Sequence, residues 1–498
     1  MSWMLDKLYQ NFEINNQQLC LCTDGKKYAY SDLAKIIISV QSILKIYPKS
    51  KIIGIVAENT PETYASIIAC WLMGLGFVPI HPKYPKERND SIIRQASIEL
   101  VLTSKNQYSG FFTKEGLEVK LTANLACPDQ QITIKSVLSS QILCILFTSG
   151  STGTPKGVPM TLDNIESTLE AFFALGYVLD SGDRFLQMFE LTFDMSILSY
   201  LPAFYLGASV FTVGVDKIRY LEAMKVMHEQ KITFAAMVPS TLALISPFFK
   251  KISLTDLKYS LLGGEPFYSD LARQWMKCVP NATVVNISGP TEITMACMGY
   301  KLNDDFSLNK EHNGILAFGN PWKNTTAVLI DEDLNILGPE ITGELCFSGK
   351  HVMEGYLNQP ELNNQVFFEK EIQEKTYRFY RTGDMAFVDK QGLFYSCGRK
   401  DLQVKIQGHK VELEEIESVA RKIFMRTNIA AIAIPDNKGS FQICLAIEGE
   451  NENKSEMIDR LQKILPSYMI PAFIKFVDSF PYNQNGKIDR IELKKMFE

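Results

Sequence analysis

Residues 146–158 read Leu-Phe-Thr-Ser-Gly-Ser-Thr-Gly-Thr-Pro-Lys-Gly-Val, after an apolar run over 142–147 that predicts a buried strand. Three glycines let this loop turn sharply and bring backbone N–H groups close to an anion: Gly150, Gly153 and Gly157. Four residues add hydroxyl groups: Thr148, Ser149, Ser151 and Thr152. Lys156 adds a positive charge, so the loop suits the phosphates of a nucleotide. The alternative is a solvated Ser/Gly linker, which rarely follows a buried strand.

The chain on both sides of this loop alternates between strand-like and helix-like segments. Strands are expected at 51–57, 77–80, 184–188, 209–213, 233–238 and 258–263, with a helix at 61–73 and further helical spans between them. This alternation predicts an α/β fold in which helices cover layered parallel sheets.

The pattern changes toward the C-terminus. From about residue 341 the chain has short strands with glycine turns, which predict a small β-barrel-like subdomain. Beyond 398–401 a small α+β unit begins, with helices expected at 412–425 and 457–465 and strands at 429–434 and 442–447. We therefore predict an N-terminal domain over 1–399 and a C-terminal domain over 402–498.

Composition narrows the class of protein. The formal net charge of -5 and the lack of a basic run argue against a nucleic-acid partner. The 10 cysteines and 5 histidines are scattered and form no zinc-binding spacing. The N-terminus lacks the pattern of a signal peptide, and the longest uncharged stretch, 63–82, is interrupted by glycine and proline. We expect a cytoplasmic protein with no membrane partner.

A carboxylate follows another predicted strand, at 283–286. Residues 286–292 read Asn-Ile-Ser-Gly-Pro-Thr-Glu, so a Gly-Pro turn brings Glu292 to a sheet edge. Mg²⁺ on nucleotide phosphates takes one or two carboxylates, which makes Glu292 a candidate ligand. The alternative is an ordinary loop glutamate.

Two further motifs suit the nucleoside. Residues 380–384, Tyr-Arg-Thr-Gly-Asp, are expected to end a strand in a turn, where Asp384 can accept hydrogen bonds from both ribose hydroxyls. Arg399 is the candidate for a second contact to ribose or phosphate. Residues 263–265, Gly-Gly-Glu, predict a flat turn against which a planar base can lie.

The order of these motifs resembles that of the adenylate-forming enzymes over essentially the whole chain. The segments that carry the resemblance are 28–33, 146–158, 263–265, 289–292, 343–344, 355–356, 380–384, 398–401 and 486–487. The resemblance implies ATP and Mg²⁺ as cofactors, a large N-terminal domain and a mobile C-terminal domain with Asp401 as the hinge. It also implies that Lys487 is the catalytic lysine of the adenylation step. Without the resemblance, this residue would be interpreted as an ordinary surface lysine beside Gly486.

The same resemblance places the remaining nucleotide and metal contacts. Thr152 joins Glu292 at the metal, and Lys156 is catalytic with Lys487. The other predicted nucleotide contacts are Gly264, Glu265, Gly289 and Thr291, with the phosphate loop, Asp384 and Arg399. One departure is Ser288, which stands where the family usually has an aromatic ring that stacks on adenine. We expect its absence to weaken ATP binding by about 1 kcal/mol.

Residues 193–196, Phe-Asp-Met-Ser, carry the substrate signal. They match a motif of peptide-synthesis adenylation domains in which the aspartate holds the α-ammonium of the substrate; the alternative for Asp194 is a helix N-cap. By the same pattern the pocket wall is Met195, Leu198, Ala236, Leu261, Gly263, Ile287, Met295 and Ala296. No wall residue is charged, which predicts an apolar or small substrate side chain and leaves its size, and the L or D form, open.

The resemblance favours a free-standing ligase similar to the D-alanine–carrier protein ligases. Such an enzyme activates an amino acid as aminoacyl-AMP and passes it to the phosphopantetheine thiol of a separate carrier protein. Gln407 and Lys410 replace arginines that are common in the loop expected to face the carrier arm. Two alternatives stay open: an acyl- or aryl-CoA synthetase in which Asp194 is structural, and a non-catalytic nucleotide-binding regulator.

Overall fold

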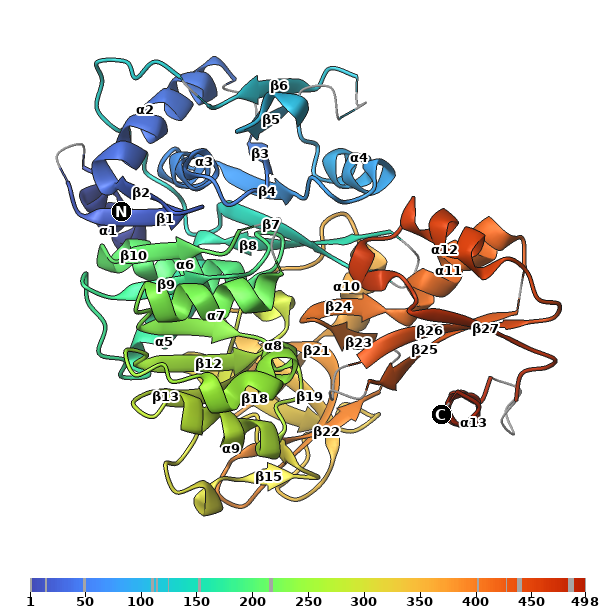
Figure 1. Ribbon diagram of the computed structural model, residues 1–498. Helices are drawn as coiled ribbons and strands as arrows, with labels where there is room; N and C mark the ends of the chain where they lie inside the picture. Colours follow the sequence, from blue (N-terminus) through green and yellow to red (C-terminus); the bar gives the residue numbers. More distant parts are fainter. Residues whose placement is uncertain are drawn as a thin grey trace.

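The computed structural model of the 498-residue chain describes residues 2–13, 16–47, 51–108, 112, 115–123, 125–150, 154–214, 218–400, 403–426, 428–436, 441–481 and 488–497. Sheets and helices in layers make up the N-terminal part, and an α+β unit follows from residue 403 (Figure 1). The predicted α/β class is confirmed.

A nine-stranded sheet carries four of the residues expected to bind substrate, Ala236, Leu261, Gly263 and Ile287. Its strands, in spatial order, are β17 (Asn320–Pro321), β14 (Met298–Lys301), β13 (Thr283–Ser288), β12 (Tyr259–Gly263), β11 (Phe234–Met237), β9 (Arg184–Gln187), β10 (Ser209–Thr212), β1 (Leu19–Thr23) and β2 (Lys26–Ala29). The strands from β13 to β1 are parallel neighbours, with Ala236 opposite Leu261 and Gly263 opposite Ile287. The carboxyl ends of β11, β12 and β13 therefore meet at one edge, where ligands bind in open α/β sheets.

A six-stranded sheet carries the loop predicted to bind phosphate, residues 148–156, called the phosphate loop below. Its order is β6 (Glu118–Leu121), β5 (Leu100–Thr103), β3 (Ile52–Val56), β4 (Gly76–Ile80), β7 (Ile142–Thr148) and β8 (Lys156–Thr161). The predicted buried strand over 142–147 is β7, which pairs antiparallel with β8 so that Thr148 lies opposite Lys156. The loop quoted above thus joins two paired strands.

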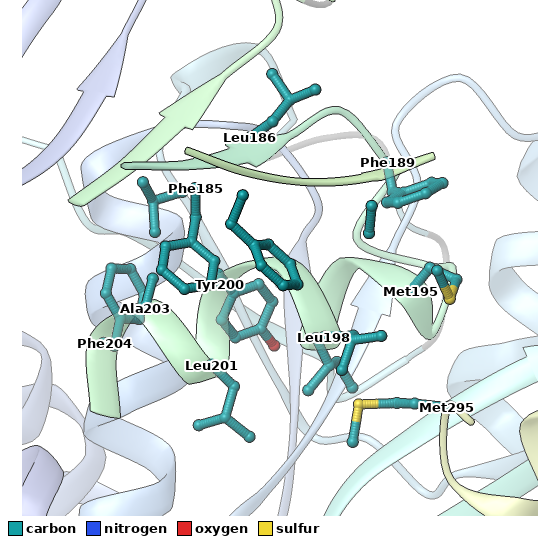
Figure 2. Packing of buried hydrophobic residues seen from close by; sticks show 14 of the residues in the cluster. Phe185, Leu186, Phe189, Met195, Leu198, Tyr200, Leu201, Ala203, Phe204 and Met295 are labelled. Atoms are coloured by element: carbon teal, nitrogen blue, oxygen red, sulfur yellow. The ribbon is translucent and has the colours of Figure 1, made fainter. Parts of the chain in front are cut away.

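Helices cover both sheets. They are α1 (Trp3–Asn11), α2 (Tyr30–Ile46), α3 (Pro61–Leu72), α4 (Lys86–Gln95), α5 (Leu162–Ala174), α6 (Met195–Leu206), α7 (Arg219–Glu229), α8 (Pro239–Ile245) and α9 (Ser269–Cys278). Residues 195–204 of α6 are all buried, and Met195, Leu198 and Met295 gather toward the N-terminal end of this helix (Figure 2). No helix in the described ranges is long and apolar enough to cross a membrane.

An antiparallel sheet follows, built from β18 (Thr325–Ile330), β19 (Gly343–Gly349), β21 (Lys375–Val388), β20 (Phe367–Ile372) and β22 (Phe394–Arg399). Short elements beside it are β15 (Glu311–His312), β16 (Ile315–Leu316) and α10 (Pro360–Val366). The prediction that residues 380–384 end a strand is wrong, because β21 continues through them to Val388. A register shift near Asp384, with Gly383 at φ 75°, bends the strand instead of ending it.

The C-terminal unit has hydrophobic cores of its own. Its elements are β23 (Gln403–Ile406), β24 (His409–Glu412), α11 (Leu413–Phe424), β25 (Ile429–Pro435), β26 (Phe441–Glu448), α12 (Lys454–Gln462), β27 (Phe473–Val477) and α13 (Arg490–Lys495). In Figure 1 this unit lies beside the N-terminal sheets, with the β23–β24 hairpin on the side that faces them. The predicted hinge, Asp401, lies outside the described residues, and the boundary at 399–402 stays a prediction.

Candidate active site

The phosphate loop leaves β7 with closely packed backbone. A Cβ atom on Gly150 would lie 2.2 Å from the carbonyl oxygen of Thr154, so only glycine fits this turn. The hydroxyl of Thr148 is buried and has no hydrogen-bond partner within the described parts of the chain. A buried hydroxyl of this kind is what a phosphate-binding loop would offer to its ligand. Ser151, Thr152 and Gly153 lie outside the described residues.

Glu292 lies just after β13, in a short turn, and is buried. Its carboxylate accepts a hydrogen bond from the Tyr356 hydroxyl at 2.7 Å and another from the Lys410 ammonium. Burial alone would raise the pKa of Glu292, but Lys410 and Tyr356 hold that pKa at about 2. The group is therefore a carboxylate that already carries a cation.

This environment fits the Mg²⁺ site that the sequence motifs predict at Glu292. Among the residues that the structure describes, no group of three or more His, Cys, Asp and Glu side chains could hold a metal without help. Mg²⁺ on a nucleotide needs no such cage, since phosphate oxygens and water complete its coordination beside one or two carboxylates. Glu292 is the side chain that would supply the carboxylate.

Asp194 immediately precedes α6, but its side chain makes no capping hydrogen bond. The side chain is buried, which raises its pKa to about 6, while the Thr291 hydroxyl and the Lys410 charge oppose the rise. A carboxylate in this position needs a positive partner. The helix N-cap alternative for Asp194 therefore loses its main support.

A small cavity joins Asp194 to the phosphate side of the site. Its lining includes Met195, Ile287, Met295 and Ala296 from the predicted wall, and its volume is about 20 Å³, room for little more than one water molecule. Four other predicted wall residues are not among those that line the cavity: Leu198, Ala236, Leu261 and Gly263. Gly263 is closely packed instead, because a Cβ there would lie 2.6 Å from Ile287.

The nucleoside residues divide between this cavity and the sheet beside it. Four predicted or noted positions line the cavity: Gly264, Ser288, Gly289 and Thr291. Asp384 is ion-paired with Arg399 at 2.6 Å across neighbouring strands, so the two predicted ribose contacts hold each other. Glu265 is partly buried and accepts hydrogen bonds from the N–H groups of Ser240 and Gly408 at 2.9 and 2.8 Å.

The β23–β24 hairpin of the C-terminal unit enters the site, as its position in the motif order suggested. Lys405, Gly408 and Lys410 line the cavity with the N-terminal residues. Gly408 has φ 84°, and a Cβ there would lie 2.7 Å from Val238, so the hairpin tip approaches as closely as glycine allows. Burial lowers the pKa of the Lys405 ammonium, and the nearby Asp384 partly opposes this.

Three contacts made by the C-terminal unit were not predicted from the sequence. Lys156 pairs with Glu412 at 3.3 Å, and the N–H of Gly150 donates to Glu415 at 3.0 Å. Arg88, on α4, donates to the same Glu415 at 2.7 Å. The two glutamates lie in the segment predicted as a helix, 412–425, but nothing in the sequence around Arg88 indicates an ion pair with a residue 327 positions away.

A larger cavity, of about 370 Å³, lies between the two parts of the chain. Phe193 lines both cavities, and His409 and Tyr468 come from the C-terminal side. The His409 ring stacks on Tyr468 with centroids 4.0 Å apart. The small cavity beside Asp194, called the acid cavity below, is therefore bordered by a wider space at the interface of the two units.

Lys487 lies outside the described residues. The segment after it is anchored within the C-terminal unit, because Arg490 pairs with Glu417 at 2.7 Å and donates to the carbonyl oxygen of Ala431. Ile488 packs against the second C-terminal core.

Comparison with known proteins agrees with the resemblance. The family model for AMP-binding enzymes matches residues 10–357, and that for their C-terminal domain matches residues 415–487. Gramicidin S synthase 1 of Brevibacillus brevis is 28% identical over 459 residues, which are 89% of this chain and 40% of the relative. The chain thus spans well under half the length of the curated relatives it matches.

Solved structures show the same fold. The Vibrio cholerae adenylation domain AlmE, in complex with glycyl-adenosine-5'-phosphate, has a TM-score of 0.86 and 20% identity, covering 100% of this chain and 98% of its own. PA1221, an NRPS protein containing adenylation and PCP domains, has a TM-score of 0.84 and 22% identity, covering 98% of this chain and 83% of its own.

Proposed function

This chain belongs to the AMP-binding enzymes, the adenylate-forming family, and on that basis we propose that it is an amino acid–carrier protein ligase. It activates an amino acid as aminoacyl-AMP with release of pyrophosphate. It then transfers the aminoacyl group to the phosphopantetheine thiol of a separate carrier protein.

The observation that carries this proposal is the buried Asp194 at the acid cavity. The cations that act on it, Lys410 and Lys405, both belong to the C-terminal hairpin and not to the substrate pocket itself. When the hairpin is withdrawn, the carboxylate needs another positive partner, and the α-ammonium of an amino acid supplies one. A fatty or aryl acid would leave Asp194 unpaired.

The cavity favours a small side chain. Met195, Ile287 and Met295 close it, and none of its apolar wall residues could pair with a charged substrate. We propose that glycine or another small apolar amino acid is the substrate. The glycyl-adenylate in the complex of AlmE, a protein of the same fold, is consistent with this size.

In the first step a carboxylate oxygen of the amino acid attacks the α-phosphorus of ATP, and pyrophosphate leaves with the electron pair of the broken P–O bond. Thr148, Gly150 and Lys156 hold the phosphates, and Glu292 would hold Mg²⁺, which when bound offsets phosphate charge. Lys487, brought in by the mobile C-terminal domain, positions both reactants, an effect worth several kcal/mol.

In the second step the thiol loses its proton and attacks the carbonyl carbon of the adenylate, and AMP leaves. The interface cavity of about 370 Å³ supports this step, since it offers a path beside Phe193 for a long, flexible thiol arm.

Replacement of Asp194 tests the proposal. We expect Asp194→Asn to raise the KM for the amino acid by about a hundredfold, because a buried charge pair is lost. Asp163→Asn, which removes an exposed carboxylate paired with Lys350, is the control and should change little. An unchanged KM for the acid in Asp194→Asn would favour the CoA-synthetase alternative, in which Asp194 is structural.

The acceptor is tested separately. The purified enzyme is supplied with its aminoacyl-adenylate and either a phosphopantetheinylated carrier protein or coenzyme A, and thioester is measured. We expect transfer to the carrier. Transfer to coenzyme A alone would contradict the carrier half of the proposal and leave amino-acid activation intact.

A further inference from the structure

Three of the groups expected to hold the phosphates and the metal, Gly150, Lys156 and Glu292, are engaged by one short segment of the C-terminal unit, β24 and the start of α11. The Glu415 carboxylate accepts the N–H of Gly150 at 3.0 Å. Glu412 pairs with Lys156 at 3.3 Å, and Lys410 donates to Glu292.

The C-terminal side chains in these contacts carry charges of the same signs as pyrophosphate and Mg²⁺. Two carboxylates contact residues expected to bind phosphate: Glu412 pairs with Lys156, and Glu415 accepts a hydrogen bond from the N–H of Gly150. One ammonium, that of Lys410, lies on the carboxylate that would bind a divalent cation. A carboxylate on a backbone N–H and on a lysine makes the same charge-assisted hydrogen bonds as a phosphate oxygen.

Backbone contacts fix the segment in this position. The Ser149 hydroxyl donates to the carbonyl oxygen of Lys410 at 2.8 Å and accepts from the N–H of Glu412 at 3.1 Å. Arg88 completes the set, because it neutralises Glu415 from the N-terminal side with side-chain exposures of 5% and 1%. These pairs are desolvated, so neither partner can be given up without a replacement.

We infer that Lys410, Glu412 and Glu415 take the places of Mg²⁺ and pyrophosphate, so that docking of the C-terminal unit and binding of magnesium pyrophosphate exclude each other. The inference rests on the proposed function and assigns these three residues a role in it. The unit docks for thiol transfer after pyrophosphate has left, and by docking it fills the site from which pyrophosphate could reverse the first step.

Competition of this kind must be reciprocal. A ligand shifts an equilibrium only by its difference in affinity for the two states, and in the docked state Gly150, Lys156 and Glu292 are already paired. Magnesium pyrophosphate should therefore release the hairpin from the site even without any amino acid or carrier.

Hydrogen exchange of the full-length protein tests this directly. The N–H groups of Gly408 and Glu412 are bonded across the interface, to Glu265 and Ser149, and report on docking. We expect magnesium pyrophosphate to speed exchange in peptides that cover 403–415, and Mg²⁺ alone or pyrophosphate with a chelator to do so less. Unchanged or slower exchange with magnesium pyrophosphate would overturn the inference.

A variant and its control extend the test. Lys410→Met leaves Glu292 unpaired in the docked state, so we expect faster exchange without ligand and about tenfold tighter apparent binding of magnesium pyrophosphate, if the wild type is docked about nine-tenths of the time. Lys422→Met changes an exposed lysine at the other end of α11 and should match the wild type. Unchanged binding in Lys410→Met would contradict the role of Lys410.

The exchange experiment does not depend on catalysis. If no amino acid supports turnover but magnesium pyrophosphate still releases the hairpin, the proposed function fails and the inference stands. If an amino acid supports turnover but the hairpin stays protected, the inference alone fails.

Discussion

At Asp194, burial and charge act in opposite directions. Burial raises the pKa of the carboxyl to about 6, the Thr291 hydroxyl and Lys410 lower it, and the charge of Glu292 raises it further. The group is therefore ionised at neutral pH but close to the pH at which it takes up a proton. Substrate recognition depends on that ionised form.

The amino-acid affinity should depend on pH for this reason. The ammonium of the substrate pairs with ionised Asp194, so protonation of Asp194 as the pH falls through about 6 removes the partner. We expect the KM for the amino acid at about pH 5 to be roughly tenfold higher than at pH 8. Steady-state kinetics across this range would show it.

Asp194→Asn is the control for that experiment. Its KM should be high at both ends of the range and should not change near pH 6, because the amide does not titrate. A wild-type KM that stays constant from pH 5 to 8 would contradict the pairing of Asp194 with the substrate.

Met295 limits the size of the acid cavity. Its backbone has φ 76° and that of Thr294 has φ 50°, a region that costs energy for residues other than glycine. Buried hydrogen bonds hold this conformation: the Thr294 hydroxyl donates to the carbonyl oxygen of His351 at 2.7 Å, and Thr168 donates to the carbonyl oxygen of Thr294 at 3.1 Å. The Met295 side chain is thereby fixed in the cavity wall.

Met295→Ala should change which amino acid is preferred. The shorter side chain leaves room for substrates with larger apolar groups, and each methylene accommodated is worth about 1–3 kcal/mol in kcat/KM. Pyrophosphate exchange with a size series of apolar amino acids measures this. Met224→Ala, on α7 and away from the cavity lining, should keep the wild-type order; the same order in Met295→Ala would contradict the role given to Met295.

At the scale of single residues, the sequence predicts which residues form the site better than it predicts which side chains pair with them. The motif patterns placed Asp194, Glu292 and Lys156 in one site, because family motifs preserve residue types and order. They did not predict that Glu292 and Lys156 would be paired with Lys410 and Glu412, since ion pairs between distant segments depend on how the two units dock. Leu198, Ala236, Leu261 and Gly263 are placed in the wall by the motif pattern but do not line the cavity.

Among the elements, β24 and the start of α11 connect the two units most closely. Arg88 on α4 and Glu415 on α11 form the most deeply buried of their ion pairs. Because α4 belongs to the six-stranded part and α11 to the C-terminal unit, this pair exists only while the units are docked. The Arg88–Glu415 pair should therefore matter for thiol transfer, the half-reaction that uses the docked arrangement.

Arg88→Met should slow thiol transfer and spare adenylation. Loss of Arg88 leaves Glu415 buried beside a single N–H donor, which destabilises docking by about 3–5 kcal/mol. Transfer from preformed adenylate and pyrophosphate exchange would be measured side by side. Arg94→Met, an exposed position on the same helix, is the matched control; equal loss in both half-reactions would contradict this role for Arg88.

The strands and helices themselves follow the sequence closely. Periodicity and β-branched runs located β7, β12 and β13 to within one or two residues, because each has a buried apolar face. The exception is β21, because residues 380–384, which the sequence predicts to end a strand in a turn, lie within it. A glycine with positive φ permits a bulge as well as a turn, and only pairing with β19 and β22 decides between them.

For the whole molecule, the proposed reaction requires two placements of the C-terminal unit relative to the active site. In the structure its β23–β24 hairpin occupies the site, and the residues that follow Lys487 are held within the unit by Arg490 and Ile488. We propose that rotation about Asp401 exchanges this placement for one in which Lys487 reaches the reactants. The two half-reactions should then separate by mutation.

Lys487→Ala is the variant that separates them. We expect adenylation to fall by about three orders of magnitude, because several kcal/mol of positioning is lost, while thiol transfer from preformed adenylate stays near the wild-type rate. Single-turnover assays of each half-reaction would measure both. Equal loss in the two assays would contradict the assignment of Lys487 to the first step.

The central claim is that the enzyme activates an amino acid, and ATP–pyrophosphate exchange tests it most directly. The panel contains L- and D-amino acids of increasing size together with fatty and aryl acids. We predict exchange with glycine or another small apolar amino acid and none with the acids that lack an amino group. Exchange only with acids that lack the amino group, or with no acid at all, would contradict the account.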